Sequence, residues 1–214
     1  MKTIIAFLLA ASVAAPASAQ VRRLPPLDDR PAVSLRPFFL FAEQSFSARK
    51  TFQTVFSKSV QPFWGGGLNV AFRSGFYIDV TASRFKKIGE RAFFFEGQGY
   101  RLGIPLTATV TPVEVTAGQR TRVGTRVFPF IGLGVGSYRY QETSEFADGP
   151  FETRHVGYLV AGGVEVRLSR WVGVSGDAQY TRVRGIIGSG GISKDAGEVD
   201  LGGIAGRVRV IVGR

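Results

Sequence analysis

The feature that most constrains this chain is an alternation of apolar with small or polar residues at a period of two. The clearest run covers residues 155–168, where Val160 and Val164 alternate with Ala161 and Glu165. Successive side chains of a β-strand point to opposite faces, so this period predicts strands with one apolar face. Comparable alternation occurs in residues 76–85, 171–182 and 204–212.

Four further segments fit the same pattern less cleanly, and they bring the predicted number of strands to eight. Residues 104–118 change phase near Pro112, which predicts a bulge or an edge irregularity because proline cannot donate to the ladder. Residues 36–45 are apolar on both faces, so their register is left open. The other two segments are residues 62–73 and 127–140.

The connections between these strands alternate in length. Short turns fall near residues 73–75, 120–126 and 169–170, and longer ones near residues 46–61, 86–103, 141–153 and 183–198. This alternation describes an up-and-down antiparallel meander. With no helix to cover the apolar faces, the economical closure is a barrel with apolar residues outside and polar residues inside. Ten residues at a rise of about 3.3 Å and a tilt of about 45° cross about 23 Å, close to the apolar band of an outer membrane. The predicted fold class is therefore all-β, an eight-stranded antiparallel up-and-down transmembrane β-barrel with short periplasmic turns and longer outer loops.

The N-terminus predicts export from the cytoplasm. Lys2 precedes an apolar stretch, and Ala17 and Ala19 form a small-x-small cleavage pattern. The alternative, a single membrane anchor, is weakened because the stretch is short for a span and lacks a stop-transfer flank. We expect a signal peptide at residues 1–19, a flexible lead-in at 20–35 and the barrel domain at 36–214.

Composition bounds the chemistry. The 214 residues carry 27 Lys and Arg against 16 Asp and Glu, a formal net charge of +11, which favours anionic partners. The absence of cysteine removes disulfides, thiolate metal sites and cysteine nucleophiles, and a single histidine excludes a His-based metal cluster. We expect no cofactor and no metal site.

The signal peptide, the eight alternating strands and the segment running from Pro129 to Gly136, PFIGLGVG, together resemble the eight-stranded outer-membrane barrel superfamily, the OmpA-like and opacity-like group. The resemblance covers about residues 36–214. It implies an outer-membrane location and a closed eight-stranded barrel. The chain ends in Val212-Gly213-Arg214, whereas barrels of this group often end in an aromatic residue that the assembly machinery reads.

Polar residues on the predicted inward faces are candidates for a barrel-interior network. An eight-stranded interior is barely wide enough for side chains, so paired acids and bases would fill it as a hydrogen-bonded plug. The functional alternative is a narrow polar conduit. The candidate network consists of Asn69, Asp79, Glu165, Arg167, Asp177, Gln179, Arg207 and Arg209.

Basic and aromatic residues mark the predicted outer loops. The candidates for contact with the outer leaflet are Lys50, Lys58, Lys86, Lys87 and Arg91, weighed against ordinary solvated surface charge. In the connection at residues 86–103, Phe93, Phe94, Phe95 and Tyr100 predict either a patch that binds a partner or a cap folded over the barrel mouth.

Two motifs could suggest catalysis or phosphate binding. The glycines at 132, 134 and 136 are spaced like part of a phosphate loop, but no helix follows them, so small residues that leave room in a narrow barrel explain them better. His155 lies at the start of a strand, near the long-loop end and on the predicted inward face. We interpret it as structural or solvated rather than as part of a Ser-His-acid site.

The sequence favours a non-enzymatic outer-membrane barrel that has a structural or surface-interaction role through its long loops. The alternatives are a narrow pore or conduit for small or apolar solutes, a lipid A-modifying enzyme, and a soluble periplasmic barrel of lipocalin type. The expected partners are outer-membrane lipid, with lipopolysaccharide as a candidate, and no nucleic acid. A partner protein is left open, and a monomer is favoured.

Overall fold

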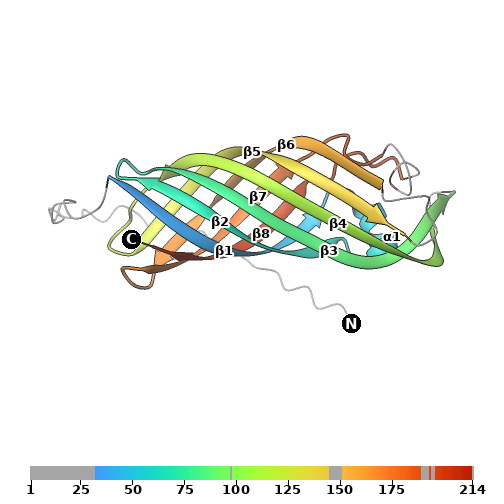
Figure 1. Cartoon of the computed structure of the whole chain (residues 1–214), viewed down its shortest axis with the longest axis horizontal. Helices are drawn as coiled ribbons and strands as arrows, with labels where there is room; N and C mark the ends of the chain where they lie inside the picture. Colours follow the sequence, from blue (N-terminus) through green and yellow to red (C-terminus); the bar gives the residue numbers. More distant parts are fainter. Residues whose placement is uncertain (1–31, 97, 145–150, 189–192, 194–195, 214) are drawn as a thin grey trace, which may run out of the picture. The chain divides into compact units, whose positions relative to one another are not determined.

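Eight antiparallel strands close into a barrel (Figure 1). The computed structural model describes residues 32–96, 98–144, 151–188, 193 and 196–213. Each strand pairs with the next along the chain, and β8 pairs with β1. This confirms the predicted strand number, order and closure. The elements are β1 (Val33–Phe46), α1 (Arg49–Phe56), β2 (Val60–Phe72), β3 (Phe76–Phe95), β4 (Gln98–Arg120), β5 (Val127–Thr143), β6 (Phe151–Arg167), β7 (Val172–Arg182) and β8 (Gly203–Val212).

The predicted signal peptide at residues 1–19 lies outside the described residues, as does the lead-in up to residue 31. β1 begins at Val33, so the expectation that the lead-in extends to residue 35 is wrong at its end. The three residues that differ already pair with the end of β2, where Val33 lies opposite Phe72.

The pairing register fixes the tilt of the strands. Tracing paired residues once around the ring from Val156 in β6 leads back to β6 at Val166, ten positions further along. With a rise of about 3.3 Å per residue and about 4.8 Å between strands, a shear of this size tilts the strands by about 40°. A barrel of this geometry has an interior that side chains fill.

The outer wall of the barrel is apolar. On β5, Ile131, Leu133 and Val135 are 63, 69 and 56 % exposed, while the glycines between them face inward. Val160 and Val164 on β6 are exposed in the same way. The predicted assignment of faces is confirmed. The lipocalin-type alternative is wrong, because it requires these apolar side chains to point inward.

The apolar band has defined edges. Trp64, Tyr158 and Tyr180 are exposed near its long-loop edge, and Trp171 is exposed at the short-turn edge. Trp and Tyr concentrate at membrane–water interfaces because their rings are apolar with one polar group. On β6 the outward positions stay free of charge from 156 to 166, a length that matches the 9–11 residues or so of a tilted membrane strand.

The predicted loop at residues 86–103 is instead a hairpin that continues β3 and β4 beyond the barrel wall. The two strands stay paired as far as Phe95 and Gln98, with a register shift between Glu90 and Ala92. Opposite the shift, Gly103 has a φ of 68°, a left-handed conformation that glycine adopts without strain. The sequence reads as a loop here because the shift interrupts the alternation.

The predicted bulge near Pro112 is wrong, because neither ladder of β4 shifts register there, but an irregularity is present on one side: the β3–β4 pairing skips Pro112 and Thr111. The pairing of β4 with β5 runs without a shift through Pro112, which lies opposite Tyr138, and Pro112 is buried. The hydrophobic pattern changes at this point because the barrel interior changes: Leu106, Ala108 and Val110 face an apolar interior, whereas Glu114 faces a polar one. The same face of the strand points inward throughout, and only the interior that it faces changes from apolar to polar.

An aromatic cluster closes the long-loop end of the barrel. Phe46 stacks on Phe52 of α1 with ring centroids 3.9 Å apart, and Phe85 contacts both rings. The connection between β7 and β8 adds Ile186 and Leu201, both almost fully buried. Two of the four predicted outer loops therefore fold into the mouth of the barrel and form an apolar upper plug.

The helix in this upper plug is short but held at both ends. Phe52, Val55 and Phe56 lie at spacings of three and four, which puts them on one buried face. At the N-terminus, the Glu198 carboxylate accepts hydrogen bonds from the backbone N–H of Lys50 at 3.0 Å and Thr51 at 2.8 Å. An acidic group suits this end of a helix because unpaired N–H groups give it a partial positive charge.

At the C-terminus of α1, the guanidinium of Arg101 donates to the carbonyl oxygen of Thr54 at 2.7 Å and to Ser57 Oγ at 2.8 Å. A cation stabilises this end, where carbonyl groups lack partners. Arg101 comes from the projecting hairpin, so the hairpin secures the upper plug.

No helix among the described residues is long and apolar enough to cross a membrane.

Candidate functional site

The candidate site is the polar half of the barrel interior, below the upper plug and towards the short turns. Of the eight residues predicted for it, the structure buries all but Arg167, which is half-buried at the short-turn rim. They come from β2, β3, β6, β7 and β8, whose alternation turns them inward.

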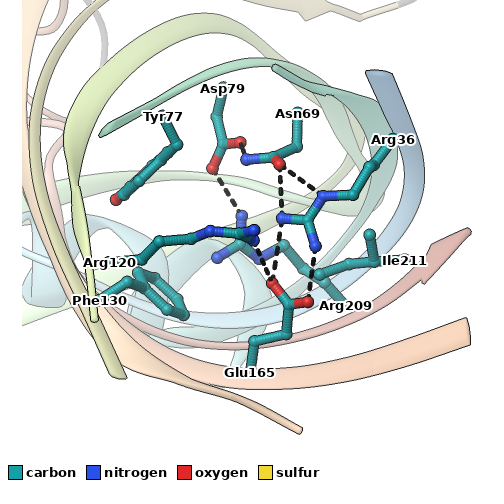
Figure 2. A pocket seen from close by; sticks show the side chains of 9 residues that line it. All are labelled: Arg36, Asn69, Tyr77, Asp79, Arg120, Phe130, Glu165, Arg209 and Ile211. Atoms are coloured by element: carbon teal, nitrogen blue, oxygen red, sulfur yellow. Dashed lines mark hydrogen bonds and ion pairs between the residues drawn. The ribbon is translucent and has the colours of Figure 1, made fainter. Parts of the chain in front are cut away.

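One cluster is centred on Arg36 (Figure 2). Its guanidinium donates to Asn69 Oδ1 at 2.9 and 2.6 Å and to the two oxygens of Glu165 at 2.6 and 3.1 Å. Asn69 in turn donates to Asp79 Oδ1, and Asp79 Oδ2 accepts from Arg209 at 2.8 Å. Figure 2 shows these side chains converging across the barrel from opposite walls.

A second cluster continues from Arg209 towards the upper plug. Asp177 lies between two guanidiniums, 2.5 Å from Arg207 Nε and 3.2 Å from Arg209 Nε. Arg207 also donates to Gln179, whose amide donates to Glu114 Oε1 at 3.0 Å. The network therefore joins the five strands that carry the predicted residues. It also includes β1, through Arg36, and β4, through Glu114.

Charge is nearly balanced inside the barrel. Removing charges from water is costly unless each is paired and hydrogen-bonded, and the network supplies those pairs. Four carboxylates face three fully buried guanidiniums, with two more basic groups at the rim. The acids are Asp79, Glu114, Glu165 and Asp177; the buried bases are Arg36, Arg207 and Arg209; and the rim bases are Arg120 and Arg167.

Little space remains between these side chains. The cavity lined by the Arg36 cluster has a volume of about 10 Å³, room for roughly one water molecule. Arg120 and Arg167 lie over the ring of Phe128 at 5.3 and 5.4 Å from its centroid, at the short-turn end. The described side chains therefore leave almost no free space around the Arg36 cluster.

Three members of the network were missed by sequence reasoning. Arg36 belongs to the strand that is apolar on both faces, yet a lone Arg in such a strand is itself a signal of an inward charge. Glu114 was missed because the alternation changes phase near Pro112, so the sequence pattern assigned no face to the residues around it. Tyr138, which donates to Glu114 at 2.5 Å, was hidden among aromatic residues.

The predicted outer-leaflet contacts divide in two. Lys50, Lys58 and Lys86 are exposed, and Arg91 is half-buried. Lys87 points the other way: it donates to Gln61 Oε1 at 3.1 Å, and its ammonium lies 5.9 Å from the centre of the Phe56 ring. The prediction for Lys87 is wrong because its position in β3 has the inward parity, so it packs against the upper plug.

The aromatic residues of the hairpin do not fold over the mouth. Phe93 and Tyr100 pair across the hairpin with ring centroids 5.4 Å apart, and both remain exposed, as does Phe95. Ala92 and Arg101 take the side that faces the upper plug. The cap interpretation is therefore wrong for Phe93, Phe95 and Tyr100, and the side chain of Phe94 lies outside what the structure describes.

Within the part of the chain that the structure describes, no catalytic constellation surrounds His155. It is exposed near the long-loop end, opposite Tyr138 in the β5–β6 ladder. Among the described residues, no hydrogen bond or ion pair links it to a hydroxyl or carboxylate. In the same part of the chain, no group of three or more His, Cys, Asp or Glu side chains is placed to hold a metal ion.

No protein-family model matches the sequence, and no curated protein matches it either. Among solved structures, Neisserial surface protein A is 12 % identical over 85 % of this chain and 97 % of its own, with a TM-score of 0.52. The attachment invasion locus protein Ail of Yersinia pestis, solved with the heparin analogue sucrose octasulfate, is 12 % identical over 85 % and 96 %, with a TM-score of 0.48. A major outer membrane protein of Thermus thermophilus is 9 % identical over 84 % and 99 %, also at 0.48.

At these identities the comparisons concern the fold, and the match to Neisserial surface protein A carries the argument. That likeness extends over nearly the whole of the other protein, and it agrees with the closed ring of eight strands described above. The chain therefore has the fold of the eight-stranded β-barrels of bacterial outer membranes.

Proposed function

We propose that this chain is an integral outer-membrane protein that crosses the bilayer as a closed barrel and presents its long-loop end at the cell surface. The observation that carries the proposal is the combination of an apolar outer wall with an interior filled in two layers, one polar and one aromatic. An exposed apolar wall needs lipid around it. A filled interior argues against an open conduit and against a substrate cavity.

The surface role rests on the projecting hairpin of β3 and β4. On the side that faces away from the upper plug, the hairpin exposes three aromatic residues beyond the long-loop edge of the apolar band. These are Phe93, Phe95 and Tyr100, which are 41, 60 and 44 % exposed. Exposed apolar groups of this kind mark contact surfaces on soluble faces of proteins. The protein acts, in this proposal, through contacts of the hairpin and without enzymatic chemistry.

The narrow-conduit alternative has one supporting observation, the polar lining of the lower interior. A conduit would require the network to separate and α1 to leave the mouth. The lipid A enzyme has no such support, since His155 has no hydroxyl or carboxylate partner among the described residues.

Labelling of intact cells tests the proposed location and orientation. The chain has no cysteine, so a single one can be introduced at Gln98 on the hairpin or at Arg170 in a short turn. We expect a membrane-impermeant maleimide to label Gln98→Cys on intact cells, and to label Arg170→Cys only after the outer membrane is permeabilised. Labelling of both on intact cells, or of neither after permeabilisation, would contradict the proposal.

A further inference from the structure

Two arginines face outward side by side at the long-loop edge of the apolar band. Arg139 of β5 and Arg154 of β6 are directly opposite each other in the ladder. Both have the parity of the lipid-facing residues of their strands, Val135 and Val156. Like charges directly opposite on neighbouring strands destabilise a sheet unless an anion compensates them.

Only one carboxylate among the described residues serves this pair, and Arg139 occupies it. Glu152 accepts from Arg139 Nε and Nη2, each at 2.6 Å, and from Gln141 at 2.9 Å. The hydrogen bonds from Arg139 lower the pKa of Glu152, with further contributions from Gln141 and Arg154. Arg154 has no hydrogen bond or ion pair with any residue that the structure describes.

The surface next to the arginines, towards the membrane centre, is apolar. Val156 is 72 % exposed, Tyr158 is 64 % exposed and Val135, opposite Tyr158, is 56 % exposed. A ligand that satisfied both parts would carry an anionic group and an apolar chain. A soluble anion or an acidic saccharide would leave the apolar part unused.

We propose that Arg139 and Arg154 form a binding site for the phosphate group of a membrane lipid whose acyl chain lies along Val156, Tyr158 and Val135. Guanidinium groups bind phosphate oxygens through paired N–H donors, and no side chain in the part of the chain that the structure describes occupies those of Arg154. The site rests on the proposed function, which puts this edge of the barrel in the outer leaflet. The ligand class is a phosphorylated lipid.

Titration of the detergent-solubilised full chain with phosphatidic acid tests the site, with the bound fraction read by native mass spectrometry. Arg154→Gln removes the cation that has no hydrogen bond or ion pair among the described residues and should weaken binding about tenfold, the effect of one charge-assisted contact. Glu152→Gln should tighten binding several-fold, because it removes the carboxylate that competes with the phosphate. Misfolding would not produce this opposite sign. Arg126→Gln, in a short turn at the other end of the barrel, removes the same charge and should leave binding unchanged.

Unchanged affinity in Arg154→Gln, or weaker binding in Glu152→Gln, would overturn the site. Displacement of phosphatidic acid by inorganic phosphate or by a sulfated saccharide at equal concentration would also overturn it, since the ligand would then be a soluble anion. None of these results depends on where the hairpin labels in cells, so the failure of this site and the failure of the proposed location are distinguishable.

Discussion

At the level of single residues, the buried Glu165 balances the charge of three arginines, whereas the exposed Glu152 pairs with one. The Glu165 carboxylate lies 2.6 Å from Arg36, 3.3 Å from Arg120 and 3.6 Å from Arg167, and it is almost fully buried. Without this charge, three guanidiniums would face one another in a narrow interior. Buried charges that lose their partner are among the most destabilising changes in a folded protein.

We therefore expect Glu165→Gln to lower the free energy of unfolding by about 3–5 kcal/mol. Refolding titrations with urea in detergent micelles measure this difference. Glu152→Gln is the matched control, because it removes the same group from an exposed bidentate pair, where a much smaller change is expected. Equal stability of the two variants would show that the interior network is not held by its charges.

Residue-level prediction from sequence succeeded where a polar group interrupts an otherwise apolar or small-residue alternation. Asp79, Asp177 and Arg209 are of this kind, and their inward direction follows from strand parity alone. Which residues bond to which could not be predicted. Arg36 meets Glu165 across 129 positions of sequence, and that contact depends on the shear of the closed barrel.

At the scale of elements, α1 depends on residues remote from it in sequence. Glu198 from the β7–β8 connection holds its first turn, and Arg101 from the projecting hairpin holds its last. An isolated helix of eight residues is unstable in water, so packing and these end contacts must stabilise it. The Phe52, Val55 and Phe56 spacing was visible in the sequence, but it is too short to distinguish from chance.

Arg101→Gln should loosen α1 while leaving the barrel intact. The guanidinium is exposed, so we expect a modest loss of about 1 kcal/mol, seen as about fivefold faster hydrogen exchange of the α1 amides. Exchange in β5 and β6 should not change. Lys58→Gln removes a nearby exposed charge and is the control. Identical exchange of α1 in Arg101→Gln and the unaltered chain would contradict the assigned role of the hairpin.

The bulge predicted near Pro112 was wrong for a reason that applies to any strand in a layered interior. Period-two reasoning assumes that one face of a strand stays apolar along its length. In β4 the inward face is polar from Glu114 towards the short turns and apolar from Val110 towards the mouth. The pattern therefore reverses where the two interior layers meet, without any change in backbone phase.

At the scale of the whole molecule, strand number, order and closure followed from alternation and connection lengths. The fate of the long connections did not. Two of them fold into the mouth, and one extends as a hairpin. The inward folding is favourable because it buries Phe46, Phe52 and Phe85 together, away from water. Such packing brings together residues far apart in the chain, which a local pattern cannot encode.

As a whole, the protein is a barrel that lipid surrounds and that its own side chains fill. Single-channel recording in planar bilayers tests this most directly, with a porin preparation as the control for insertion. We expect the purified protein to insert without stable conductance steps, and Asp177→Asn to leave that baseline unaltered. Stable steps in the unaltered protein that change in size with Asp177→Asn would show that the interior is not filled and would identify it as a conduit.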